Sequence, residues 1–224
     1  MLLSELLTML ITCCLSMNTI QGDEICYNHL GCFYNTKSGK IRPLPWSPEK
    51  INTRFLLHTR DNPEMYQEIF SGNMTSVRRS AFRIRQKTVF IVHGLADTAE
   101  DNWVSQMIRE ILRVEDVNCV GVDWRDGAAH LHLYAQASSN IQVVGGEIAF
   151  LVTRLQEELD YPPSHVHLIG HSLGAHAAGE AGKRCRGIDT EKSLHLDSSD
   201  AELVDIIHTD ADPVFGEILY SPRF

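Results

Sequence analysis

Residues 164–183 read Ser-His-Val-His-Leu-Ile-Gly-His-Ser-Leu-Gly-Ala-His-Ala-Ala-Gly-Glu-Ala-Gly-Lys. The apolar side chains of Val166, Leu168 and Ile169 predict a short buried strand at the start of this stretch. The second half is rich in alanine and glycine, which favours a helix that packs closely against a sheet. The stretch therefore predicts a strand, a sharp turn and a helix in immediate succession.

The turn holds a serine between two glycines, in the order Gly170-His171-Ser172-Leu173-Gly174. This order fits Gly-x-Ser-x-Gly, in which a strained turn lifts a nucleophilic serine above the end of a strand. The glycines suit such a turn because its neighbouring segments approach too closely for a Cβ atom. The alternative is an ordinary tight turn with a solvated serine. The strand and helix around the motif favour a nucleophile.

Length and charge limit the classes of protein that this chain can belong to. Its 224 residues, 43% of them hydrophobic, suffice for the core of one domain or a little more. A net charge of −9 and the lack of runs of Lys or Arg argue against binding to nucleic acid or to an anionic membrane. Neutral lipid surfaces stay possible.

The amino-terminal segment has the pattern of a secretory signal. Residues 2–16 are apolar but too short for a comfortable membrane span, and small and polar residues follow through Gly22. We expect residues 1–22 to be a signal peptide, cleaved after Gly22, and the mature protein to be secreted, without a transmembrane segment. A buried helix or a membrane anchor is the alternative, because the segment carries Glu5 and no basic residue.

Cysteine positions and one sequon agree with this compartment in part. Cys26 and Cys32 are close enough to close a small disulfide loop. Cys119 lies in an expected core strand and is interpreted as a buried thiol, and Cys185 has no obvious partner. Asn73 begins the N-glycosylation sequon Asn-Met-Thr in a polar loop.

The remaining pattern alternates strands with helices. Residues 23–48 are expected to be loop-like, and residues 64–82 are ambiguous. Strands are predicted at 51–59, 88–92 and 117–124, and helices at 103–114 and 141–159. Alternation of this kind implies parallel strands joined by right-handed crossovers. The predicted fold class is α/β, with a mostly parallel sheet and helices on both faces.

Several motifs resemble those of the pancreatic triacylglycerol lipase family. They are Cys26-Tyr-Asn-His-Leu-Gly-Cys-Phe33, Leu44-Pro-Trp-Ser-Pro48, Asn52-Thr-Arg-Phe-Leu-Leu57, Val122-Asp-Trp124, residues 166–182 and Ile206-Ile-His-Thr-Asp210. The resemblance implies an α/β-hydrolase domain that cleaves acylglycerol esters at a lipid–water interface. In that family a lid, further strands and a β-sandwich that docks colipase follow. We therefore interpret residues 23–224 as a partial lipase domain, for which colipase docking is not expected.

The resemblance also assigns roles at the turn. Ser172 would attack the ester carbonyl, and the backbone N–H groups of Leu95 and Leu173 would form the oxyanion hole. His93 precedes this loop and is interpreted as a core histidine whose ring is satisfied by a neighbour.

A serine nucleophile needs a base and an orienting acid, expected here in the order Ser, Asp, His. The nearest match to the acid is Asp189, against the alternative of a solvated loop carboxylate. The histidine of the family has no match, and His208 and His195 are poor substitutes. The expectation is a lipase-type hydrolase whose shortened chain has weak or no activity. The alternatives are a non-catalytic relative that binds lipid or a partner, and a chain too short to fold stably.

A second resemblance concerns a structural calcium site. Leu196-Asp-Ser-Ser-Asp200 resembles a calcium loop of the family, with carboxylates from Asp197 and Asp200 and backbone carbonyls from Lys192 and His195 as ligands. An ordinary Asp-rich turn is the alternative, because Lys192 and His195 add positive charge where acid or arginine is usual.

Overall fold

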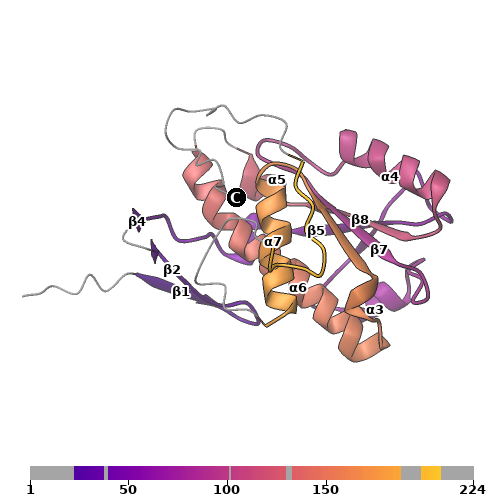
Figure 1. Ribbon diagram of the computed structural model, residues 1–224, viewed down its shortest axis with the longest axis horizontal. Coiled ribbons are helices and arrows are strands. Elements are labelled where there is room, and N and C mark those ends of the chain that lie inside the picture. Colours follow the sequence, from indigo (N-terminus) through magenta and orange to yellow (C-terminus); the bar gives the residue numbers. More distant parts are fainter. Residues whose placement is uncertain (1–22, 38–39, 101, 130–132, 188–197, 208–224) are drawn as a thin grey trace, which may run out of the picture.

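The computed structural model describes residues 23–37, 40–100, 102–129, 133–187 and 198–207. Its central feature is a five-stranded sheet in the order β6-β5-β8-β7-β9 (Figure 1). The strands are β5 (Arg54–His58), β6 (Gln67–Ile69), β7 (Thr88–Val92), β8 (Asn118–Asp123) and β9 (Val166–Gly170). β7 pairs in parallel with β8 and with β9, whereas β5 is antiparallel to both of its neighbours. All strands except β5 therefore run in one direction, as a mostly parallel sheet requires.

Helices and two short hairpins surround this sheet. The helices are α2 (Pro48–Ile51), α3 (Met74–Arg78), α4 (Trp103–Val114), α5 (Arg125–Ala128), α6 (Tyr134–Leu159), the 3-10 turn η2 (Pro163–His165) and α7 (Leu173–Cys185). The hairpins are β1 (Glu24–Tyr27) with β2 (Gly31–Tyr34), and β3 (Thr36–Lys37) with β4 (Lys40–Ile41). Among the helices of the described residues, none is both long and apolar enough to cross a membrane.

The two faces of the sheet contribute to separate cores because successive strand residues point to opposite sides. Phe90 and Val92 of β7 join a cluster that contains α6 and α7, whereas Val89 and Ile91 join a cluster that contains α4. In Figure 1, α6 and α7 lie side by side and α4 stands apart from both. Helices therefore cover both faces, as the sequence predicted.

Small residues allow α7 to lie close to α6. A Cβ atom on Gly145 of α6 would lie 2.7 Å from the carbonyl oxygen of Ala177 and from Cβ of Glu180. No real Cβ atom approaches other heavy atoms so closely, so the helices can keep this distance only if residue 145 is glycine. Gly145 of α6 thus permits the close approach of the two helices.

The predicted elements 88–92 and 103–114 coincide with β7 and α4, but four expectations were wrong in detail. The helix expected at 141–159 begins earlier, because α6 starts at Tyr134. Residues 23–48 were expected to be loop-like and instead contain the β1–β2 and β3–β4 hairpins. The strand expected at 51–59 begins only at Arg54, because α2 ends at Ile51 and Asn52 adopts a left-handed conformation with φ 53°. β9 is only partly buried, because it is the edge strand among the described residues.

The β1–β2 hairpin is attached to the helical face by polar contacts. The guanidinium of Arg184 on α7 donates to the carbonyl oxygen of Leu30 at 2.7 Å. The ring of His29 lies 3.2 Å from the Glu147 carboxylate on α6 and stacks on Phe150. These contacts join segments that lie more than 100 residues apart, for example a separation of 118 for His29 and Glu147.

Candidate active site

Ser172 stands between β9 and α7 in a conformation that few residues adopt. Its backbone has φ 54° and ψ −121°, and its side chain is exposed. It is the N-cap residue of α7, yet its hydroxyl makes no capping hydrogen bond. A positive φ at a non-glycine residue costs about 1–3 kcal/mol and persists only where the surrounding structure imposes it. The hydroxyl is thus presented to solvent by a strained turn.

The turn is tight because glycines flank it, as the sequence predicted. A Cβ atom on Gly170 would lie 2.4 Å from the carbonyl oxygen of Gly174, and one on Gly174 would lie 2.2 Å from that of Val92. The backbone N–H of His171 donates to the same Val92 oxygen at 3.0 Å. The start of α7 is therefore packed directly on the end of β7.

The loop after β7 lies beside the serine. A Cβ atom on Gly94 would be 2.9 Å from Cβ of Ser172. The loop is held on its other side by a hydrogen bond from the Ala96 N–H to the Ala128 carbonyl at 2.8 Å. In the described part of the chain, the N–H groups of Leu95 and Leu173 donate no hydrogen bond outside regular helices and strands. The N–H of Leu173 is in the first turn of α7, where helical donors have no partner within the helix.

His93 is fully buried beneath this loop, and both of its ring nitrogens have contacts. Nδ1 lies 2.8 Å from the Gly94 carbonyl oxygen, and Nε2 lies 3.0 Å from the backbone nitrogen of Trp124 and 3.3 Å from Oδ1 of Asp123. The ring also stacks on the Trp124 indole, with ring centroids 5.5 Å apart. The prediction of a core histidine satisfied by its neighbours is confirmed.

Asp123 is the buried centre of a charge cluster at the end of β8 whose other members are partly exposed. Its Oδ2 accepts hydrogen bonds from Arg125 at 2.8 Å and from Arg54 at 3.4 Å. Arg54 also donates to Glu100 at 2.9 Å, and the Tyr66 hydroxyl donates to the same carboxylate at 2.7 Å. Burial alone would raise the pKa of the Asp123 carboxyl, but the hydrogen bond from Arg125 and the positive charge of its guanidinium hold that pKa well below its usual range.

This charge cluster was not assigned by the sequence analysis. Val122-Asp-Trp124 was noted only as a motif of resemblance, and Arg54 only as part of another motif. An aspartate at the end of a buried strand is a signal that could have indicated a buried partner, because buried charges are paired. Which residues would pair with it depends on the register of β5 against β8, where Arg54 lies opposite Asp123.

Most predicted residues of the acid and calcium sites lie outside the described residues: Asp189, Lys192, His195 and Asp197, together with the poor base candidate His208. Asp200 is described and buried, and its Oδ1 lies 3.5 Å from Nζ of Lys183. A lysine ammonium at that carboxylate already balances its charge. Three of the four predicted calcium ligands lie outside the described residues, so the calcium site stays a prediction.

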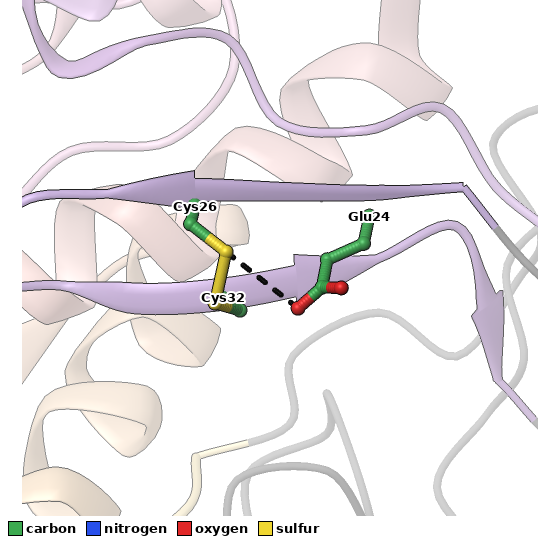
Figure 2. A group of neighbouring side chains, drawn as sticks. All are labelled: Glu24, Cys26 and Cys32. Carbon is green, nitrogen blue, oxygen red and sulfur yellow. Dashed lines mark hydrogen bonds between the residues drawn. A yellow bond between two sulfur atoms is a disulfide. The ribbon is translucent and has the colours of Figure 1, made fainter.

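The predicted disulfide between Cys26 and Cys32 is present. Figure 2 shows it beside Glu24; within the described residues, these are the only three His, Cys, Asp or Glu side chains whose ligand atoms all lie within 4.8 Å of one another. Both sulfurs are bonded to each other and offer no thiolate, so this group is no metal site. Cys119 is a free, buried thiol as predicted, and burial, with the nearby charge of Glu115, raises its pKa to about 12.

An exposed serine on a strained turn between a strand and a helix, on a mostly parallel sheet covered by helices on both faces, defines an α/β-hydrolase. A family model described as Lipase matches residues 23–219. The chain therefore belongs to the lipase family.

Pancreatic lipases and their related proteins are among its relatives. Pancreatic triacylglycerol lipase of Cavia porcellus is 46% identical over 225 residues, which cover 91% of this chain and 48% of that protein. Pancreatic lipase-related protein 2 of Rattus norvegicus is 48% identical over 221 residues, covering 89% and 47%. Inactive pancreatic lipase-related protein 1 of Homo sapiens is 44% identical over 218 residues, covering 88% and 46%. The chain spans about half the length of these relatives.

Proposed function

We propose that this protein is a secreted carboxylic ester hydrolase of the triacylglycerol lipase type, with Ser172 as its nucleophile. The observation that carries the proposal is the exposed, strained Ser172 beside the loop of Gly94 and Leu95. Strain of this kind persists where the surrounding structure imposes it, and it clusters at active sites.

The reaction that this geometry supports is acyl transfer. The Ser172 oxygen attacks the ester carbonyl, and the resulting oxyanion accepts hydrogen bonds from the N–H groups of Leu95 and Leu173. Collapse of the tetrahedral intermediate expels the alcohol and leaves an acyl-serine, which water then hydrolyses. The amino terminus of α7, a helix of 13 residues, favours negative charge at this position.

Turnover also requires a base and its acid. We propose Asp189 as the acid, from its resemblance alone. No histidine of the described part of the chain hydrogen-bonds to the Ser172 hydroxyl, so we assign no base there.

The proposed substrates are acylglycerols at a lipid–water interface. Support comes from relatives named triacylglycerol lipase and from a net charge of −9, which disfavours anionic surfaces. Secretion after removal of residues 1–22 is supported by the Cys26–Cys32 disulfide, because such bonds persist in oxidising compartments.

N-glycosylation at Asn73 belongs to the same proposal. Asn73 is exposed, and its Oδ1 accepts the Thr75 N–H at 3.1 Å, which leaves Nδ2 for a glycan. Secretion from cultured animal cells, followed by a mass loss on treatment with an N-glycosidase that Asn73→Gln abolishes, would support it. Secretion of an unmodified chain would contradict the glycan.

The decisive experiment is labelling by an alkyl p-nitrophenyl phosphonate, which phosphonylates activated serines and releases p-nitrophenol. We expect one equivalent of label on Ser172 in the full chain and none in Ser172→Ala. A tributyrin rate that Ser172→Ala abolishes would extend the assignment to turnover. Absence of label on the folded wild-type chain would refute Ser172 as an activated nucleophile.

A second candidate function is non-catalytic binding of lipid or of a protein partner. It is favoured by the human relative that is named inactive and is 44% identical to this chain. Co-sedimentation with neutral triolein emulsions without phosphonate labelling would support this candidate. Labelling at Ser172 would support the hydrolase instead.

A further inference from the structure

We propose that His93 is a positioning residue for the oxyanion hole, because it orients the peptide group between Gly94 and Leu95. The inference rests on the proposed function of Ser172 and deepens it. It follows from the contacts of the His93 ring, which joins that peptide to β8.

The first step concerns the geometry of one peptide group. The carbonyl oxygen of Gly94 and the N–H of Leu95 belong to the same planar trans peptide, so they point in opposite directions. His93 Nδ1 lies 2.8 Å from that carbonyl oxygen and is fully buried. Fixing the oxygen on the buried side fixes the direction of the Leu95 N–H on the opposite side. Gly94 lies against Ser172, so the direction of the Leu95 N–H matters for a reaction at Ser172.

The second step concerns the proton on the ring. The Trp124 backbone N–H can only donate, and it lies 3.0 Å from His93 Nε2, so Nε2 accepts. The Gly94 carbonyl oxygen can also only accept, and it lies 2.8 Å from Nδ1, so Nδ1 carries a proton and donates it to this carbonyl. The hydrogen bond from Trp124 at Nε2 thus favours the tautomer with its proton on Nδ1, and this tautomer can hold the Gly94 carbonyl.

The third step concerns rigidity. The Trp124 indole stacks on the His93 ring at an angle of 14° and donates from Nε1 to the His93 carbonyl at 2.9 Å. Asp123 lies at the far edge of the ring, 3.3 Å from Nε2, and is itself held by Arg125 and Arg54. The ring thus cannot rotate without breaking several buried contacts. A displacement of about 1 Å at a reacting centre can lower the rate by about a hundredfold. A rigid His93 ring would therefore help to keep the rate high by holding the Gly94–Leu95 peptide in place.

Two substitutions separate positioning from packing. In His93→Asn, the side-chain amide can donate from the place of Nδ1 to Gly94 but no longer reaches Trp124. In His93→Gln, the side-chain oxygen can accept from the Trp124 N–H at the place of Nε2 but leaves the Gly94 carbonyl without its donor. Each variant keeps one of the two hydrogen bonds and loses the other. A role in packing alone predicts similar effects of both.

The rate of Ser172 labelling by the alkyl p-nitrophenyl phosphonate is the first readout, because negative charge develops on the phosphoryl oxygen in the oxyanion hole. We expect His93→Gln to slow labelling by about 10- to 100-fold and His93→Asn by less than about threefold. Equal rates in all three proteins, or equal slowing in both variants, would overturn the proposal. Thermal unfolding of each variant controls for loss of fold.

A second readout does not depend on reactivity. In the full wild-type chain, ¹⁵N spectra of the imidazole should show the proton of His93 on Nδ1. The ¹³C resonance of the Gly94 carbonyl should shift in His93→Gln and stay near its wild-type position in His93→Asn. A proton on Nε2 alone would overturn the positioning role, and so would a Gly94 carbonyl resonance that does not shift in His93→Gln. If the wild-type chain takes no label while these spectra are as expected, the proposed function fails and the orientation of the peptide stands.

Discussion

The strain at Ser172 predicts that a substitution which removes the nucleophile should also stabilise the protein. The perturbation is Ser172→Gly, and the matched control is Ser172→Ala. Alanine keeps a Cβ atom at φ 54° and removes only the hydroxyl, which makes no capping hydrogen bond to α7. Glycine removes the Cβ atom as well and adopts a positive φ without steric cost.

The size of the effect follows from two opposing contributions. Relief of an imposed positive φ at a non-glycine residue contributes about 1–3 kcal/mol to the folded state. Glycine also gives the unfolded chain more freedom, which lowers the free energy of unfolding by about 0.4–1 kcal/mol. Ser172 is exposed, so removing its Cβ atom leaves no buried cavity. We therefore expect Ser172→Gly to be about 0.5–2 kcal/mol more stable than Ser172→Ala.

The assay is equilibrium unfolding in urea, with equal slopes in the two variants as a condition for comparing their midpoints. Phosphonate labelling should be absent in both, which separates stability from chemistry. A Ser172→Gly protein that is as stable as Ser172→Ala, or less stable, would refute the reasoning, because the turn would then hold no relievable strain. The prediction thus tests whether the turn that exposes the Ser172 hydroxyl is strained and whether the rest of the fold offsets that strain.

Other consequences follow from close contacts and buried charges. Gly174→Ala should lower the free energy of unfolding by about 1–3 kcal/mol, because the added Cβ atom would lie 2.2 Å from the Val92 carbonyl oxygen. The control Gly72→Ala adds its Cβ atom in open space and should change the free energy of unfolding by less than about 0.5 kcal/mol. Equal changes of the two variants in urea titrations would contradict this expectation. The Asp123 pKa is lowered in the folded state, so its contribution to stability is full above its usual pKa near 3.8 and is lost as the pH falls below that value. Asp123→Asn should therefore be less stable at pH 7 and lose less stability between pH 5 and 2 in acid titrations followed by circular dichroism; a steeper loss than in wild type would be the contrary result. If the Lys183 ammonium is the counter-ion of Asp200, calcium chloride should leave the melting temperature unchanged, whereas a rise with calcium that EGTA reverses would support the predicted calcium site.

Local patterns in the sequence were sufficient for the elements around Ser172. The apolar run 88–92 and the helical spacing in 103–114 predicted β7 and α4 with their observed bounds. The glycines around Ser172 predicted the sharp turn, because a short-range steric rule governs it. These features depend on residues that are neighbours along the chain, so the order of amino acids suffices to predict them.

Long-range pairings could not be predicted in this way. The attachment of the β1–β2 hairpin to α6 and α7 and the antiparallel position of β5 depend on contacts with distant segments. Lys183 meets Asp200 across residues 188–197, so the positive charge at the expected calcium loop came from a helix that the sequence analysis had not connected with it.

The sequence by itself determined that a serine would stand on a strained turn between a strand and a helix, because that turn is built from adjacent residues. Only the tertiary structure decided what surrounds the serine. The parallel pairing of β7 with β8 and β9 brings Gly94 to Ser172 and the His93 ring to Trp124. Contacts between residues 31 to 78 positions apart depend on strand register and helix packing, which arise only when the whole sheet has formed.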